Sequence, residues 1–291
     1  MTGFLEIDNL SAVIRGSQDR ILRSVSLQVN TGEVHGLVGE SGAGKSMIGK
    51  AVLGILPGAI EIVEGQVRLD GEDLFALHLN ERRRLIGTKA ALIPQDPLTA
   101  LNPSRRIRAQ ITDRLVDVLG WTKHDAANRA AELLEEVHIS DPARVLASYP
   151  HELSGGMRQR VLIASAFAAN PQLVIADEPT TALDVTVQKQ ILRLIRELQQ
   201  RHGTAMLFVT HDLGVVSKIC QRLSVLFAGK VVEQAEVAQF YRSPRHDYSR
   251  ALLVATPKYT EPLTSLMPVD ESVISAVSVE IEAADREWRG V

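Results

Sequence analysis

The sequence has 291 residues, of which 45% are hydrophobic and 23% charged, and its formal net charge is −3. This composition is ordinary for a globular protein, and it lacks the global basic field that nucleic-acid-binding proteins carry. The single cysteine, Cys220, excludes an internal disulfide and cannot by itself hold a zinc or iron–sulfur site. Because we find neither a signal-peptide core nor a run of about 18 apolar residues, we expect a soluble, cytoplasmic chain without a membrane span.

Short alternating runs of apolar and polar residues open the chain. Residues 5–7 and 24–29 alternate in this way, and residues 65–71 form a third run that ends in an Asp-Gly turn. Alternation of this kind predicts strands, so we expect an antiparallel β layer beside the short run 33–38, which is typical of a buried parallel strand.

A glycine-rich stretch that fits the P-loop pattern follows this buried strand and precedes a predicted helix over 47–53. Its residues are Gly39, Glu40, Ser41, Gly42, Ala43, Gly44, Lys45 and Ser46. The glycines allow backbone N–H groups to approach an anion, and the helix N-terminus adds positive potential. Lys45 can reach the β- and γ-phosphates of a nucleotide, and the Ser46 hydroxyl can bind Mg²⁺. The alternative is a glycine-rich turn without a ligand.

The middle of the chain is predicted to be a helical insert over residues 96 to about 160. Two prolines bracket Gln95, and the following 60 or so residues show helical spacing without strand signals. The insert ends at Ser154, Gly155 and Gly156, where the serine suits a helix N-cap and the glycines permit close approach of a phosphate.

Two carboxylates, Asp177 and Glu178, end the next apolar strand, 173–178. Asp177 can hold Mg²⁺, and Glu178 can orient and deprotonate a water; the alternative is a pair of capping acids before a proline. A loop containing Asp184 leads into an amphipathic helix, and a further strand over 205–209 is followed by His211. A histidine at the end of a parallel strand lies where α/β sheets bind ligands, although a lone histidine is usually structural.

Together these motifs resemble the nucleotide-binding subunit of an ABC transporter, over about residues 4–257. The stretches 95–103, 149–160, 177–186 and 243–248 are most similar to the ATPases of oligopeptide and dipeptide importers, a group that includes nickel importers. The resemblance implies an α/β fold, in which a RecA-like parallel-sheet core carries an antiparallel β subdomain and a helical subdomain at about 96–160. It also implies an ABC domain over 1–257 and a separate tail over 258–291.

The resemblance further implies how the residues act. Two such domains would face each other head to tail, with each ATP between Lys45 of one and Ser154, Gly155 and Gly156 of the other. Gln95 would contact Mg²⁺, Glu178 and His211 would drive hydrolysis, and Asp184 would lie beside the nucleotide. The partners would be a second copy or a sibling ATPase, two membrane-spanning permease subunits and, indirectly, an extracytoplasmic substrate-binding protein, with no nucleic acid. The chain would lie at the cytoplasmic face of the inner membrane.

Two departures from the family pattern are visible. The tail 258–291 has no cysteine and carries seven acids and three bases, so we expect no iron–sulfur cluster and partial disorder. No aromatic residue or histidine lies between Phe4 and His35, so Val13 or Ile14 would cover adenine. Peptide is the first expectation for the transported substrate and nickel or another metal chelate the second. A soluble non-transport ABC ATPase, an exporter and a P-loop kinase are the competing classes.

Overall fold

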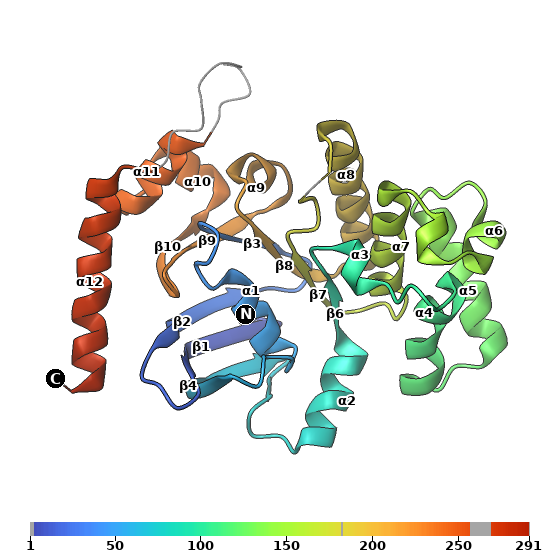
Figure 1. The fold of residues 1–291 in the computed structure, drawn as a ribbon, viewed down its shortest axis with the longest axis horizontal. Coiled ribbons are helices and arrows are strands. Elements are labelled where there is room, and N and C mark those ends of the chain that lie inside the picture. The colour runs from blue at the N-terminus through green and yellow to red at the C-terminus, as the bar shows by residue number, and fades with distance from the viewer. Residues whose placement is uncertain (1–2, 182, 257–268, 291) are drawn as a thin grey trace. The chain divides into compact units, whose positions relative to one another are not determined.

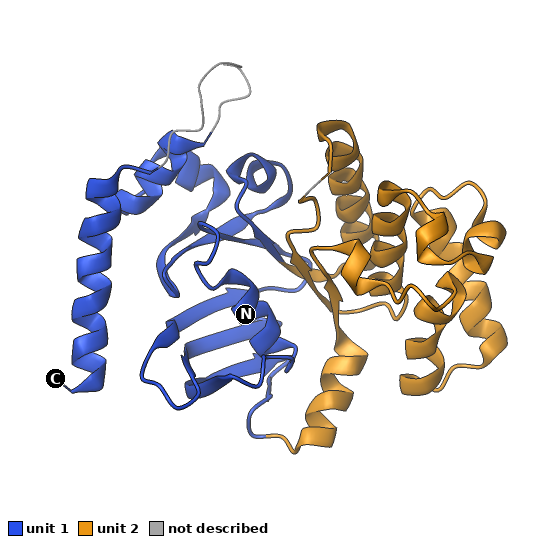
Figure 2. Cartoon of the chain, viewed as in Figure 1, with its two compact units in different colours: residues 1–76, 208–291 blue, residues 77–207 orange. Residues whose placement is uncertain are grey.

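A computed structural model describes residues 3–181, 183–256 and 269–290 of the chain (Figure 1). These residues form two compact units, which Figure 2 shows in different colours. Unit 1 consists of residues 1–76 and 208–291, and unit 2 of residues 77–207. The P-loop stretch, residues 39–46, falls in unit 1. Asp177, Glu178 and the Ser-Gly-Gly stretch 154–156 fall in unit 2.

An antiparallel sheet in unit 1 confirms the predicted β layer. Its strand order is β2-β1-β4-β5, with β1 at Leu5–Ile14, β2 at Arg20–Val29, β4 at Ile60–Leu69 and β5 at Glu72–Asp73. Strands β1 and β4 are longer than the predicted runs because their alternation is interrupted. Asn9 and Gly65 have φ angles of 48° and 93°, and the β1–β4 register shifts between Asp8 and Ser11.

A six-stranded sheet has the order β10-β9-β3-β8-β7-β6. Its strands are β3 Val34–Val38, β6 Ala90–Ile93, β7 Leu173–Asp177, β8 Ala205–Thr210, β9 Arg222–Phe227 and β10 Lys230–Glu236. Strand β3 pairs in parallel with β9, and β6 pairs in parallel with β7. Every residue of β3 and β8 is buried, which explains why most of their side chains are apolar, His35 and Thr210 being the polar ones.

Five helices are described in unit 1. They are α1 Lys45–Val52, α9 Leu213–Ile219, α10 Val237–Arg242, α11 Asp247–Ala255 and α12 Glu271–Arg289. Helix α12 lies in the tail for which we expected partial disorder, and it buries Val277, Ile281 and Asp285. Residues 258–268 and 291 of that tail lie outside the described residues. Contacts with distant parts of unit 1, such as the ion pair of Asp285 with Arg23, hold residues 271–289 in place, and the expected partial disorder of the tail stays a prediction.

The helices of unit 2 occupy the stretch predicted to be a helical insert and continue beyond it. They are α2 Leu79–Lys89, α3 Pro97–Ala100, α4 Ile107–Asp113, the π-helix η1 Arg114–Val118, α5 Lys123–Glu136, α6 Pro142–Ala147, the 3₁₀-helix η2 Pro150–Glu152, α7 Gly155–Phe167 and α8 Val185–His202. None of the helices in the described part of the chain has the length and hydrophobicity needed to cross a bilayer.

Candidate nucleotide-binding site

The phosphate loop, residues 39–46, connects the buried strand β3 to helix α1, as the sequence predicted. The Lys45 side chain folds back over the loop, and its Nζ donates hydrogen bonds to the carbonyl oxygens of Gly39 (2.9 Å) and Glu40 (2.8 Å). Gly44 is the residue before α1, and no side chain caps this helix. The ammonium group and the N-terminus of α1 therefore lie at the same turn, and both attract anions.

Two glycines of the loop are required by close packing. A Cβ at Gly39 would lie 2.1 Å from the carbonyl oxygen of Leu226, and one at Gly44 would lie 3.3 Å from that of Ile21. Gly44 also has a φ of 99°, which other residues rarely adopt. In contrast, a Cβ at Gly42 would meet nothing within 4 Å. The loop is thus packed tightly against the rest of unit 1 at Gly39 and Gly44, and it is open at Gly42.

A tyrosine from helix α11 packs beside the phosphate loop. Tyr248 is fully buried, with its ring centroid 4.7 Å from that of Phe227. Burial, together with the nearby Glu40 carboxylate, raises the pKa of the Tyr248 hydroxyl well above its ordinary value. The side chain of Tyr248 therefore remains a neutral phenol. The sequence analysis did not single out this residue.

The predicted catalytic carboxylate is held by two side chains of unit 2. Gln95 follows β6 and Glu178 follows β7, and these strands are parallel neighbours. Gln95 Nε2 donates to Glu178 Oε2 at 3.1 Å, and Thr181 Oγ1 donates to the same oxygen at 2.9 Å. Glu178 has a φ of 46°, an uncommon conformation for a non-glycine residue and one that often marks functional sites.

Thr181 was missed by the sequence analysis, although a hydroxyl three residues after Glu178 was a readable signal. Its hydrogen bond fixes the direction of the carboxylate. A further residue of this kind is Gln159 of α7, whose buried side chain donates to the carbonyl oxygen of Pro179 at 2.8 Å. These contacts hold the turn after β7 from both sides.

Two further predicted site residues of unit 2 are the N-cap residues of helices. Ser154 caps α7, because its Oγ accepts a hydrogen bond from Met157 N (3.3 Å). Gly155 follows at the exposed start of this helix, and a Cβ there would meet nothing within 4 Å. Asp184 caps α8 by accepting from Thr186 N (3.0 Å) and Val187 N (2.9 Å). The predicted cap at Ser154 is therefore confirmed, while contact of these residues with a nucleotide stays a prediction.

His211 directly follows strand β8 and is exposed. The next residue, Asp212, caps helix α9 by accepting a hydrogen bond from Val215 N at 3.3 Å. The end of the strand and the cap together determine where the His211 backbone lies.

The residues expected to cover adenine differ in exposure. Ile14, the last residue of β1, is 42% exposed, whereas Val13 is buried. The two ring-bearing residues that flank this region in the sequence, Phe4 and His35, are buried in the core of unit 1. Ile14 is therefore the residue of this group that presents an apolar surface.

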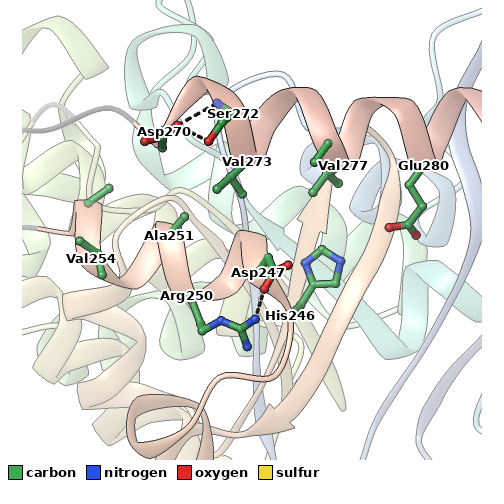
Figure 3. Close-up of a pocket in the computed structure, with 12 residues that line it drawn as sticks. His246, Asp247, Arg250, Ala251, Val254, Asp270, Ser272, Val273, Val277 and Glu280 are labelled. Atoms are coloured by element: carbon green, nitrogen blue, oxygen red, sulfur yellow. Dashed lines mark hydrogen bonds and ion pairs between the residues drawn. The ribbon is translucent and has the colours of Figure 1, made fainter.

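A separate groove of about 640 Å³ lies between α11 and α12 (Figure 3). Val254, Val273 and Val277 line it together with charged side chains, including Arg250 and Glu280. None of the predicted nucleotide-site residues borders this groove.

We compared the chain with known protein families and with known proteins. The family model described as ABC transporter matches residues 22–181. The chain belongs to the ABC transporter family. This ABC transporter chain is 46% identical, over 87% of its length and 77% of the relative, to the probable D,D-dipeptide transport ATP-binding protein DdpD of Escherichia coli. It is 44% identical, over 88% of its length and 79% of the relative, to the dipeptide transport ATP-binding protein DppD of the same organism.

Solved ABC structures share the fold of this ABC transporter chain. One is a dimeric post-hydrolysis state of the ATP-binding cassette MJ0796 bound to ADP and phosphate, with a TM-score of 0.71 and 26% identity. The similarity covers 80% of this chain and 98% of that one. The expected α/β fold of an ABC ATPase is thereby confirmed, and the chain is an ATPase of the ABC type.

Proposed function

We propose that this ABC ATPase binds ATP on the phosphate loop and powers the uptake of peptides. Two observations support ATP binding: the Lys45 side chain folds back over the loop, and the loop is open at Gly42. An incoming β- or γ-phosphate can replace the two backbone carbonyl oxygens as the partner of Lys45, because a phosphate is the stronger acceptor for an ammonium group.

Mg²⁺ fits the donor groups that the chain offers. The Ser46 hydroxyl, the Asp177 carboxylate and the Gln95 amide are oxygen donors, which Mg²⁺ prefers. Because Gln95 directs its Nε2 toward Glu178, its amide oxygen can serve as a ligand. When bound, Mg²⁺ would supply positive charge that neutralises the phosphate groups.

Glu178 is the proposed general base for hydrolysis. A base must be held within reach of the attacking water, and hydrogen bonds from Gln95 and Thr181 hold this carboxylate in one orientation. His211 is proposed to contact the γ-phosphate and the attacking water. The reaction transfers the γ-phosphoryl group from ATP to water, with ADP as the leaving group, and the base accepts the proton of that water.

The second half of each ATP site is proposed to come from a partner ATPase, either another copy or a sibling subunit. Ser154, Gly155 and Gly156 would bind the γ-phosphate of the partner's nucleotide at the N-terminus of α7, and Asp184 would lie beside it. The open space at Gly155 supports this assignment, since a phosphate can approach the backbone there.

Peptide import is the function we propose for the assembled transporter. The observation that carries it is the 44–46% identity, over 87–88% of the chain, to ATP-binding proteins of dipeptide transport. The helices over 96–160 would dock on two permease subunits at the cytoplasmic face of the membrane, and an extracytoplasmic binding protein would deliver the peptide.

Uptake by reconstituted vesicles tests this function. The chain is purified with the permease and ATPase subunits encoded beside it, and ATP-dependent accumulation of labelled dipeptides, longer peptides and Ni²⁺ is compared. We expect peptide uptake with the wild type and loss of uptake with Glu178→Gln. Accumulation of Ni²⁺ without peptide, or co-purification with ribosomes rather than membrane proteins, would contradict the proposal.

A further inference from the structure

A buried ion pair joins helix α12 to strand β2 in unit 1. Asp285 accepts hydrogen bonds from Arg23 Nε (3.0 Å to each carboxylate oxygen) and from Arg23 Nη2 (2.8 Å). Arg20 Nη1 lies 3.5 Å from the same carboxylate, and its guanidinium stacks 4.6 Å from the ring centroid of Trp288. The side chains of Arg23 and Asp285 are 17% and 11% exposed, so the pair is largely shielded from water. Fork-like pairing of this kind fixes the orientation of a guanidinium.

The same Arg23 also holds the turn between β9 and β10. Its Nη1 donates to the carbonyl oxygen of Ala228, and its backbone N donates to that of Gly229 (2.8 Å). Ala228 and Gly229 form a two-residue hairpin turn in which both φ angles are positive, 42° and 79°. Glycine adopts this conformation readily, whereas alanine adopts it only at an energetic cost. The conformation at Ala228 therefore benefits from an external hydrogen bond.

This turn contacts the phosphate loop directly. Gly229 N donates to the carbonyl oxygen of Ala43 at 2.8 Å. A Cβ at Gly44 would lie 3.6 Å from Gly229 Cα, so the two backbones are in close contact. A shift of the Ala228-Gly229 turn would therefore move Ala43 and Gly44, the residues just before Lys45.

We infer that Asp285 is a positioning residue for the phosphate loop, acting through Arg23 and the Ala228-Gly229 turn. The Asp285 carboxylate orients the guanidinium of Arg23, and this guanidinium donates a hydrogen bond to the Ala228-Gly229 turn. The turn itself donates a hydrogen bond to the carbonyl oxygen of Ala43. This role goes beyond the proposed transport function and rests on it only in taking ATP as the ligand of the loop. On this inference helix α12 supports the nucleotide site, although none of its residues is among the predicted nucleotide-site residues.

The substitution Asp285→Asn tests the inference because it keeps the size of the side chain and removes its charge. Its matched control is Glu280→Gln on the same helix, which breaks the exposed 2.8 Å ion pair with Lys230. We expect Asp285→Asn to weaken ADP binding about three- to tenfold, while kcat at saturating ATP stays close to that of the wild type. Glu280→Gln should bind ADP like the wild type. Amide hydrogen exchange of residues 39–46 should quicken in Asp285→Asn alone.

A second variant keeps the test decisive if Asp285→Asn folds poorly. Arg23→Lys retains the positive charge but cannot hold Asp285 and Ala228 with one planar fork, so it should show the same loss of ADP affinity. Wild-type ADP affinity in a folded Asp285→Asn or Arg23→Lys protein would overturn the inference. So would an equal loss in Glu280→Gln, because that result would mean that any loosening of α12 has the same effect. Failure of the wild type to bind ADP would instead contradict the proposed ATP site.

Discussion

Gln95 and Glu178 are hydrogen-bonded side chain to side chain at 3.1 Å, although 83 residues separate them in the sequence. They follow neighbouring parallel strands, β6 and β7, so the sheet itself brings an amide and a carboxylate to the same edge. Movement of the Gln95 loop must therefore change the surroundings of the Glu178 carboxylate.

Glu178→Gln should lower the rate of ATP hydrolysis by about 10²–10⁴-fold, because glutamine cannot accept the proton of the attacking water. Nucleotide binding should persist, since the phosphate loop is unchanged. The measurement is ATP turnover of the assembled transporter beside an ATP titration. Glu197→Gln, at an exposed position of α8, is the matched control. Near-normal turnover of Glu178→Gln would remove Glu178 from the role of base.

Gly155→Asp should abolish hydrolysis without unfolding the chain. The added side chain meets no atom within 4 Å of its Cβ in this chain, so the effect must come from a negative charge facing the partner's γ-phosphate. Gly58→Asp, at another exposed glycine with free space around it, is the control. In a homodimer, mixing Gly155→Asp with Lys45→Ala subunits should restore part of the activity, because one of the two sites is then intact. Wild-type turnover of Gly155→Asp would disprove the shared site.

Ile14→Tyr should tighten ATP binding by about 1–2 kcal/mol if its ring lies flat on adenine. The half-exposed Ile14 offers dispersion contacts but no aromatic face, so GTP should compete with ATP within a small factor in the wild type. Titration of both nucleotides against wild type and variant decides this. Val118→Tyr, at a similarly exposed residue of unit 2, should have no effect. Strong wild-type preference for ATP with no gain in Ile14→Tyr would show that adenine already has an aromatic partner.

Glu136 should make stability depend on pH in the acidic range. Burial acts to raise the pKa of Glu136, but hydrogen bonds and charges from Arg129 and His202 outweigh it, so the pKa lies below its ordinary value of 4.5. A lowered folded pKa contributes stability that is present above the unfolded value and is lost as the pH falls through the folded pKa. Glu136→Gln should therefore cost about 1–3 kcal/mol at neutral pH.

The midpoint is measured at neutral pH and again at an acidic pH below the lowered pKa of Glu136, where wild type and Glu136→Gln should approach each other in urea midpoint because the wild-type carboxyl is then protonated. The control is Glu132→Gln, which removes a partner of the same Arg129 but at a side chain that is 64% exposed. It should change the midpoint little at either pH. A gap for Glu136→Gln that is equally large at both pH values would contradict this account.

The elements that the sequence predicted correctly have a strong local signal. Buried strands such as β3 and β8 are mostly apolar and wholly buried, and Ser154 before two glycines is a recognisable helix cap. The strand at 5–7 was predicted too short because the positive φ at Asn9 and the register shift beside it interrupt the alternation of β1.

Other features depend on partners far away in the sequence. The acidic composition of the tail favoured disorder, but Asp285 in α12 is paired with Arg23 and Arg20 of β2. Gln159 is likewise paired with a distant partner, the carbonyl oxygen of Pro179, which lies 20 residues further along the chain. Local patterns predict which backbone forms, whereas these side-chain partners follow from the packing of the complete fold.

The pairing of Arg23 with Asp285 also has a consequence during protein synthesis. The two residues are 262 positions apart, so at about 5–20 residues per second the ribosome adds Asp285 roughly 13–50 s after Arg23. Until then, Arg20 and Arg23 lack the carboxylate that compensates their charge, and burying them unpaired is costly. The nascent β2 must therefore keep these two side chains solvated while the rest of the sheet is made. The support of the phosphate loop thus forms later than the loop itself, and a newly made chain acquires its full affinity for nucleotide only after α12 has left the ribosome.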